Sequence, residues 1–365
     1  MDSLSQIVLG GALAAAIAPA RHRRAALAAG AALGTLPDLD SVPMWFLGLD
    51  PVTSMTWHRG PSHSLLVLVP FAALLWWWFK RRGGRVAESP VRWYWAITLA
   101  LVTHPLLDAF TVYGTQLWWP LPPSPAMWAS VFIIDPLYTL PLLLAFVFAL
   151  VRGWRPSAQH ALVAGLALST AYLGWSLVAK AMVGRAAETT LATMGLQDAP
   201  RFSVPMPFNT LLWRVVVMTP DGFLEGERSL VADEGPMVFR EYASDTRALE
   251  EASGFPAVRR LRWFNHGFMK AEQREGRLVL SDLRMGAEPD YSFRFVVAER
   301  DGDGWREVVP GQIAWPWEAR RRLSQMWDRI WVRPAEETAL AAAGTTRIQA
   351  AAAKSGEMPA ASASK

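Results

Sequence analysis

Two of the six histidines in this 365-residue chain lie in one short stretch, WHRGPSHS, at residues 57–64. Gly60-Pro61 breaks any helix, and Ser62 is a suitable N-cap for a helix over the apolar run 65–79. We therefore expect His58 on a loop and His63 on a first helical turn, so that the chain can bring both rings to one point. The alternative is a pair of interfacial histidines that are hydrogen-bonded to the backbone.

Acidic residues elsewhere in the first half of the chain extend this stretch into a candidate metal site. Asp38 and Asp40 are two apart in PDLD, so an extended loop would point both to one side, where they can chelate a hard cation. His104 and Asp108 are four apart and share a helix face, and Pro105 should kink that helix. The alternatives are a loop aspartate that caps a helix and a buried His–Asp pair that joins two helices.

Mixtures of histidine and carboxylate suit zinc, manganese or iron. The candidate ligands are Asp38, Asp40, His58, His63, His104 and Asp108. This set is larger than a closed tetrahedral site uses, which leaves open a two-metal site or one open metal with supporting carboxylates. In either case the metal would lower the pKa of bound water to about 7.

Two further residues are candidates for a catalytic role. Asp135 could act as a general base or orient a ligand. Arg59, between the two histidines, could clamp a phosphate with two hydrogen bonds, and the alternative is an interfacial arginine that reaches the lipid head groups.

The composition indicates a membrane protein. Apolar residues make up 52% of the chain, and many of the 19 tryptophans lie beside apolar runs, as in the aromatic belts of membrane proteins. Cysteine is absent, which excludes disulfides, thiolate metal sites and cysteine nucleophiles. The formal charge of +4 is modest and the arginines cluster in short loops, so we expect no nucleic-acid partner. Residues 1–6, MDSLSQ, lack the positive charge with which a signal peptide begins, so we expect no cleavable signal peptide.

About six apolar segments are expected to cross the membrane, at residues 4–20, 25–36, 64–79, 93–113, 131–151 and 160–183. The second is short, so residues 25–46 either span or form a re-entrant segment. Basic loops follow the first, third and fifth segments, which predicts that this side is cytoplasmic. The candidate ligands and Asp135 then converge at one level near the outer face, and the chain after residue 184 lies outside the cytoplasm.

The composition changes after residue 184. Runs of strand-forming residues predict a small, mostly antiparallel β domain over 185–315, with strands near 214–218, 228–232, 237–242, 277–283 and 291–298. We expect an amphipathic helix on the membrane surface over 316–334 and a disordered tail over 335–365. The predicted fold class is therefore an α-helical multi-pass membrane domain over 1–184, followed by a mostly-β extracytoplasmic domain.

The motifs, taken as a set, resemble a known family. MDSLSQIVLGGA, GTLPDLD, HRGPSHS, THPLLDAFTVYGTQLWWP and VFIIDPLYTLP occur in this order, and in them the chain is similar to the YdjM-type family of inner-membrane metal-dependent hydrolases. PMPFNTLLWRVVVMTPDGFLEG and LRWFNHGFMKAE resemble the C-terminal part of its longer bacterial members. The resemblance implies a bacterial inner-membrane protein whose PDLD, HRGPSHS and HPLLD motifs hold a divalent metal through the six candidate ligands. Many members have a histidine where this chain has Gln6, so Gln6 and Asp2 are peripheral candidates.

The leading functional hypothesis is a membrane-embedded metal-dependent hydrolase that acts on a phosphoester or lipid-like substrate through metal-activated water. Zinc is the expected metal, with manganese and iron as alternatives. An amphiphilic substrate suits a site at bilayer depth, and Trp118 and Trp119 could seat its tails. The competing hypotheses are a metal-binding or transport protein without hydrolytic activity and a partner-binding protein whose soluble domain carries the function.

Overall fold

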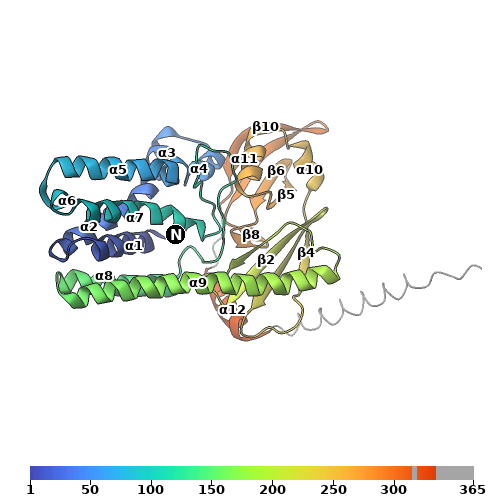
Figure 1. The fold of residues 1–365 in the computed structure, drawn as a ribbon. Helices are drawn as coiled ribbons and strands as arrows, with labels where there is room; N and C mark the ends of the chain where they lie inside the picture. The colour runs from blue at the N-terminus through green and yellow to red at the C-terminus, as the bar shows by residue number, and fades with distance from the viewer. Residues whose placement is uncertain (315–318, 334–365) are drawn as a thin grey trace, which may run out of the picture.

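The computed structural model describes residues 1–314 and 319–333, and it consists of a helical region followed by a β-sheet domain (Figure 1). The fold class predicted from the sequence is confirmed at this level. The tail expected over 335–365 lies outside the described residues, as do residues 316–318 and 334 of the expected amphipathic helix.

Six longer helices form the helical region, and short helices join them. The longer ones are α1 (Ser3–Ile17), α2 (Arg23–Thr35), α5 (Leu65–Arg81), α7 (Pro90–Ala109), α8 (Pro136–Arg152) and α9 (Pro156–Thr193). The short ones are η1 (Ala20–His22), η2 (Leu36–Asp40), α3 (Ser41–Leu47), α4 (Pro51–Trp57), η3 (Pro61–His63) and α6 (Gly84–Glu88).

Side-chain caps explain where several of these helices begin. Asp2 caps α1, Asp50 caps α4 and Asp135 caps α8, each by accepting hydrogen bonds from backbone N–H groups of the first turn. The expected N-cap at Ser62 is wrong: Ser64 caps α5, because Pro61 starts the short 3-10 turn η3, which contains Ser62 and His63. His63 is therefore held in a turn before α5 and not on its first turn.

Helices α1 and α2 pack with almost no space between their backbones. A Cβ atom on Gly10 would lie 2.4 Å from the carbonyl oxygen of Gly30, and one on Gly34 would lie 2.5 Å from that of Gln6. Contacts of this kind are typical of helices that associate through small residues in lipid. They fix the C-terminal end of α2, and with it the start of η2.

One described helix, α9, is long and apolar enough to cross a bilayer. The segments Pro51–His63 and Leu65–Arg81 are bent by 46° relative to each other, and they would make a second span only if the two together cross the bilayer once. Helices α1 and α8 are apolar but shorter. The six crossings expected from the sequence therefore stay a prediction.

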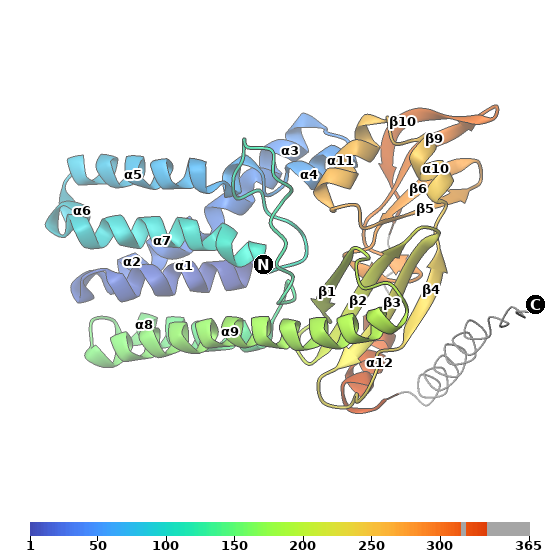
Figure 2. The same cartoon turned by 45° about the vertical axis from the view of Figure 1, so that its right-hand side comes forward.

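The three basic loops meet at the end of the bundle that lies away from the β domain (Figure 2). Arg21 in η1 pairs with Glu88 in α6 at 2.6 Å. Arg23, at the start of α2, donates to the carbonyl oxygen of Gly153 between α8 and α9 at 2.9 Å. The positive charges that suggested an orientation from the sequence are thus gathered at one end of the bundle.

The C-terminal domain contains two four-stranded antiparallel sheets. The first has the order β1-β2-β3-β4, with β1 (Arg201–Pro205), β2 (Leu212–Thr219), β3 (Gly222–Ser229) and β4 (Phe239–Ala243). The second has the order β10-β9-β6-β5, with β10 (Gly304–Gln312), β9 (Arg294–Asp301), β6 (Arg277–Asp282) and β5 (Met269–Arg274). The remaining elements are α10 (Thr246–Glu251), α11 (Pro256–Phe264), the short pair β7 (Gly286–Ala287) and β8 (Asp290–Tyr291), and α12 (Ala319–Trp331).

Four of the five expected strands overlap β2, β4, β6 and β9. The run at 228–232 is misplaced, because β3 already begins at Gly222 and ends at Ser229. Thr219 pairs directly with Gly222, which makes Pro220-Asp221 the tight turn between β2 and β3. Helix α12 packs on this domain through Arg329, whose Nη2 lies 2.6 Å from Asp233 Oδ2.

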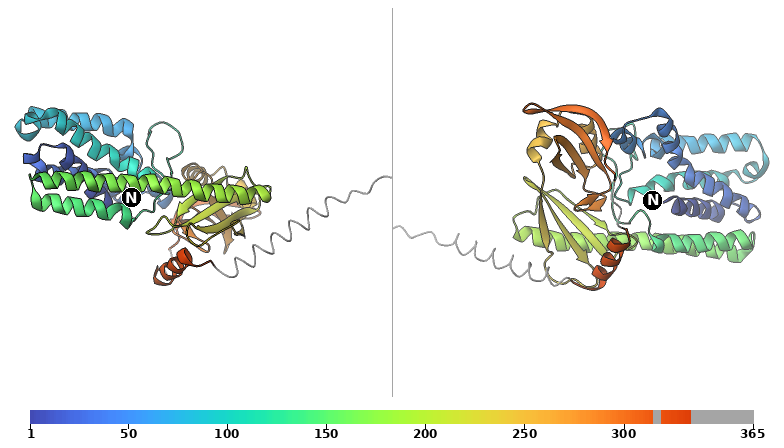
Figure 3. Two further views of the ribbon diagram at one scale, coloured as in Figure 1. Left: turned by 60° about the horizontal axis from the view of Figure 1, so that its bottom comes forward. Right: turned by 180° about the vertical axis from the view of Figure 1, so that it is seen from behind.

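Helix α9 and the 110–135 segment join the two regions. Figure 3 shows α9 running from the bundle along the first sheet. Its residues Ala179, Val183, Ala187 and Leu191 share a buried cluster with Trp213 and its neighbours on β2. In a second cluster, Val52 of α4 and Tyr113 of the 110–135 segment lie with residues of α11 and both sheets. The β domain therefore packs against the end of the bundle that carries the candidate ligands.

Candidate metal centre

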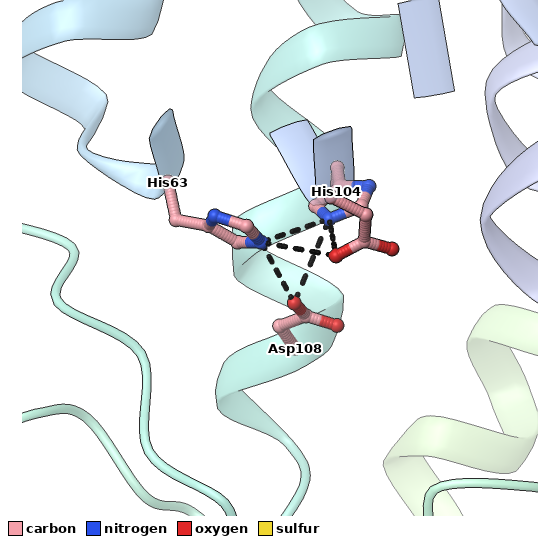
Figure 4. Close-up of side chains that lie close together, drawn as sticks. His63, His104 and Asp108 are labelled. Carbon is pink, nitrogen blue, oxygen red and sulfur yellow. Dashed lines mark hydrogen bonds and ion pairs between the residues drawn. The ribbon is translucent and has the colours of Figure 1, made fainter. Parts of the chain in front are cut away.

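Four of the six predicted ligands meet at one point. Asp38 comes from η2, His63 from η3, and His104 and Asp108 from α7. One ligand atom from each lies within 4.8 Å of the other three. Figure 4 shows His63, His104 and Asp108 turned toward one another, and these three side chains are fully buried.

The separations between these atoms match those around a single ion. His63 Nε2 lies 3.1 Å from His104 Nε2, 3.2 Å from Asp108 Oδ2 and 3.4 Å from Asp38 Oδ1. His104 Nε2 lies 3.3 Å from Asp38 Oδ1 and 3.6 Å from Asp108 Oδ2. Two ligand atoms at about 2.0–2.1 Å from one tetrahedral zinc ion lie about 3.3 Å apart. Five of the six ligand pairs therefore have about the spacing found around one divalent cation, and all four ligand atoms lie within 4.8 Å of one another.

The ring of His104 is oriented by a backbone carbonyl. His104 Nδ1 lies 2.6 Å from the carbonyl oxygen of Gly34 at the end of α2. Because a carbonyl only accepts hydrogen bonds, Nδ1 carries the proton, and the lone pair of Nε2 in the neutral ring faces the other ligands. A metal-binding histidine is commonly held in this way by the ring nitrogen that does not bind the ion.

The ring of His63 is oriented by a serine and a carboxylate. Ser62 Oγ donates its proton to Asp40 Oδ2 at 2.7 Å, so its lone pair is available to His63 Nδ1 at 2.9 Å. His63 Nδ1 therefore acts as the donor, and its Nε2 presents a lone pair to the cluster. Both imidazoles use their N–H groups away from the cluster, as a cation would require.

Asp108 supplies an oxygen without a hydrogen-bond donor. Its Oδ1 accepts from Gln6 Nε2 at 2.9 Å and from the amino group of Met1. Its Oδ2 is buried and accepts no hydrogen bond of regular geometry from any described residue, although it forms an ion pair with Arg59 Nε at 3.1 Å and lies 3.2 Å from His63 Nε2. A buried carboxylate oxygen is rarely left in this state unless an ion or a water molecule completes it. The donor set and this oxygen fit a divalent metal ion.

Asp40 and His58 lie beside the cluster and not in it. Asp40 accepts from His58 Nδ1 at 2.8 Å, from the backbone N–H of Arg59 at 3.1 Å, and from Ser62. Burial alone would raise the pKa of the Asp40 carboxyl, but the hydrogen bonds from His58 and Ser62 hold that pKa below its usual value. The structure thus assigns Asp40 to organising the 58–63 turn, with the His58 ring 5.9 Å from that of His63.

Arg59 reaches the cluster from an unusual backbone conformation. Its φ of 63° is left-handed, which a residue with a side chain adopts at an energetic cost. The side chain is buried, with Nε 3.1 Å from Asp108 Oδ2 and Nη1 donating to Thr111 Oγ1 at 3.1 Å. Its guanidinium carbon lies 4.9 Å from the centre of the Tyr113 ring. Arg59 therefore places a positive charge next to the ligand Asp108.

Asp135 lies in a different environment. Its Oδ1 accepts from the backbone N–H groups of Leu137 at 3.1 Å and Tyr138 at 3.4 Å, and its Oδ2 accepts from Tyr172 Oη at 2.8 Å. Both oxygens are thus used to start α8 and to hold α9, and Asp135 is not among the clustered ligands. The Asp-Pro sequence at 135–136 was the signal for this role, since proline is favoured at the first position of a helix.

Sequence reasoning missed three groups that support the cluster. The carbonyl of Gly34 and the hydroxyl of Ser62 lie inside the recognised motifs, but their roles depend on the turn geometry. Tyr113 lies with its ring 5.6 Å from that of His58, and its backbone oxygen accepts from Arg284 Nη1 of the β domain at 2.9 Å. No short-range pattern connects Tyr113 with Arg284.

The fold and the site together define the class of protein. It has a helical region with a candidate metal centre, a buried cluster of Asp and His side chains, at one end. The YdjM inner membrane protein family matches residues 1–183, which include all four clustered ligands, Arg59 and Asp135. That match covers half of the chain, and the protein belongs to this family. No curated protein and no solved structure matches the chain.

Proposed function

We propose that this protein is a membrane-embedded metal-dependent hydrolase that acts on a phosphoester or lipid-like substrate. The observation that carries the proposal is the spacing of Asp38, His63, His104 and Asp108, with lone pairs of both rings directed to one point. Membership of an inner-membrane family supports the location.

The four clustered residues would hold one divalent ion. Zinc suits two imidazole nitrogens and two carboxylate oxygens, and manganese and iron accept the same donors. The ion would supply Lewis acidity and water with a pKa near 7. Gly34 and Ser62 hold the histidine rings, and Gln6 holds Asp108, so the ligands are positioned before an ion binds.

The charge of the centre supports an anionic substrate. The carboxylates of Asp38 and Asp108 balance one divalent cation, and the positive groups beside Asp108, which are Arg59 and the amino group of Met1, make the centre net positive. A buried positive centre attracts an anion such as a phosphoester more strongly than a surface charge does. The guanidinium of Arg59 is thus suited to bind a substrate oxygen while Nε stays near Asp108.

A metal-binding protein without hydrolytic activity is the second candidate, and the number of ligands favours it. Four protein ligands complete a tetrahedral site, whereas catalytic zinc sites keep one position open. The hydrolase proposal therefore requires a fifth position or a ligand that moves. Asp38 is the natural candidate, because its side chain is 20% exposed while those of His63, His104 and Asp108 are fully buried.

We also infer that α1, α2, α5, α7, α8 and the first half of α9 cross the inner membrane. The basic loops at the far end of the bundle then face the cytoplasm, and the β domain lies outside it. The gathering of Arg21 and Arg23 with Glu88 and Gly153 at one end of the bundle supports this orientation.

Metal content, measured by mass spectrometry on detergent-purified protein, tests the centre directly. We expect one equivalent of zinc, manganese or iron in the wild type and its loss in His63→Ala and His104→Ala. His160→Ala is the matched control, because this exposed histidine at the start of α9 should leave the metal content unchanged. Wild-type protein that binds no metal even after reloading would overturn the proposal.

Cobalt substitution then separates the two candidate functions. Visible absorption of the cobalt-loaded protein reports the coordination number, and a small competing anion such as azide perturbs it only if a position is open. An anion-sensitive spectrum, followed by activity in a phosphoesterase and lipase screen, is the result expected for a hydrolase. A tetrahedral spectrum that no anion changes, with no activity in the screen, would favour a structural or storage site.

A further inference from the structure

No residue of helix α3 is buried by the described part of the chain. Trp45, Phe46 and Leu47 are 77%, 75% and 70% exposed. The segment 41–49, SVPMWFLGL, carries no charge and has one hydroxyl. Gly48 then turns the chain back with a φ of 58°, and no atom lies within 4 Å of where its Cβ would be. Three consecutive large apolar side chains are thus presented outward.

Water is an unfavourable environment for this helix. A helix that is apolar on all sides is normally found in a protein core or in a membrane, and no described part of the chain buries α3. Tryptophan is enriched at the boundary between hydrocarbon and head groups, and helices that lie in this layer carry tryptophan, phenylalanine and leucine on their apolar face. Burying these three side chains in that layer would remove their exposed apolar surface from water, which is favourable.

The position of α3 indicates that lipid covers its exposed side chains. It lies at the edge of the bundle, close to the end that faces the β domain (Figure 2). Other large apolar side chains at this part of the chain are exposed as well, namely Leu66 and Val69 on α5, Trp57 at the end of α4, and Trp118. In an inner-membrane protein, an apolar surface of this kind faces the bilayer.

Helix α3 also lies next to the open side of the candidate metal centre. It begins directly after η2, which carries Asp38 and Asp40, and α4 leads back to His58. The side chains of Asp38, Asp40 and His58 are 20%, 14% and 26% exposed, whereas the other three predicted ligands are fully buried. The partly exposed edge of the cluster is therefore the one that η2 forms, directly before α3.

We propose that α3 inserts into the interfacial layer of the bilayer and that the open side of the metal centre consequently faces lipid and not bulk water. The second part rests on the proposed function and deepens it. An amphiphile with an anionic head group would reach the centre from within the membrane, with its apolar chain still in lipid.

The absence of cysteine allows a clean test with single spin labels. Phe46→Cys reports on α3, and Leu39→Cys, on an exposed side chain between Asp38 and Asp40, reports on the open side of the centre. Val309→Cys on β10 is the aqueous control and Leu144→Cys on α8 is the lipid control, both at strongly exposed apolar positions. Each labelled protein is placed in phospholipid vesicles, and accessibility to oxygen and to a water-soluble nickel chelate is measured by power saturation.

We expect the labels at residues 46 and 39 to be accessible to oxygen and at least several-fold less accessible to the nickel chelate than the label at 309. A nickel accessibility at 46 equal to that at 309 would place α3 in water and overturn the inference. Low accessibility to both reagents at 46 would indicate burial in another protein molecule and would overturn it as well. If the label at 39 has the accessibilities of the label at 309 while the label at 46 has those of the label at 144, α3 lies in the membrane but the open side of the centre faces water. That result would overturn only the second part of the proposal.

These outcomes are independent of the metal measurement. The labels at 46 and 309 report on depth whether or not the protein binds metal. A protein that binds one equivalent of metal but places α3 in water refutes the inference and leaves the proposed function standing. A protein that binds no metal but places α3 in the interfacial layer refutes the proposed function and leaves α3 as a membrane anchor.

Discussion

The histidines of the candidate centre are oriented by groups that lie outside the cluster of candidate ligands. His104 donates its Nδ1 proton to the carbonyl of Gly34, and His63 donates to Ser62, which in turn donates to Asp40. Such partners keep both rings in the tautomer that presents Nε2. The difference between a ligand and its support can therefore be tested one residue at a time.

Asp108→Asn and Asp40→Asn should differ in their effect on metal affinity. Asp108→Asn removes a charge and a ligand oxygen, so we expect metal binding to be lost. Asp40→Asn weakens only the support of the 58–63 turn, for which a loss of about 10–100-fold in affinity is typical. Competition with a chromophoric chelator measures both dissociation constants. If the two variants lose the metal equally, Asp40 is itself a ligand.

Ser62→Ala should weaken metal binding by about 10-fold, because His63 Nδ1 loses its acceptor and the ring loses its fixed orientation. The matched control is Ser54→Ala in α4, where the hydroxyl donates only to the carbonyl of Leu49 at 3.3 Å. The same competition assay applies to both variants. An unchanged dissociation constant for Ser62→Ala would show that the serine does not orient the ring.

At the scale of elements, the centre depends on how closely α1 and α2 approach. Gly34 combines two tasks: its missing side chain admits the backbone of Gln6, and its carbonyl holds His104. Gln6 in turn donates to Asp108. Packing of the two helices and orientation of two ligands are therefore set at one contact.

Gly34→Ala should destabilise the protein and weaken the metal site together. The new Cβ would lie 2.5 Å from the carbonyl oxygen of Gln6, and overpacking of this kind costs about 1–3 kcal/mol in free energy of unfolding. Gly174→Ala in α9 is the control, since no atom lies within 4 Å of its new Cβ and alanine favours the helix by up to about 1 kcal/mol. Thermal unfolding in detergent and metal content distinguish the two. A Gly34→Ala variant with unchanged Tm would contradict the close packing.

The types and spacing of residues predicted which side chains gather, but not what each one does there. Asp38, His63, His104 and Asp108 were identified because ionisable groups within apolar segments usually have a function. The sequence could not distinguish Asp40 and His58 from the four clustered residues. What keeps these two outside the cluster is the 3-10 turn that begins at Pro61. The catalytic role expected for Asp135 stays a prediction, and in the structure its side chain caps α8. Among the strands, β1, β5 and β10 were missed because their runs are short or interrupted by proline, glycine and charges.

At the scale of the whole molecule, the orientation in the membrane can be checked with the same cysteine-free chain. We expect Val309→Cys on β10 to react with an impermeant maleimide once the outer membrane is opened. Ala87→Cys in α6, at the basic end, should react only after the inner membrane is disrupted. Both side chains are exposed in the structure, so burial does not decide the result. Equal labelling of both positions from one side would refute the proposed orientation.

The length of helix α9 sets the distance between the membrane and the β domain. It has 38 residues and is therefore about 57 Å long. One face of it carries Tyr172, Ser176 and Lys180, which bond in turn to Asp135, Ser130 and Ser203. Inserting a single alanine after Gly174 would advance everything beyond it by about 1.5 Å and turn it by about 100°. That shift would turn Ser176 and Lys180 away from their partners, so α9 should tolerate substitutions on its outer face far better than any change in its length.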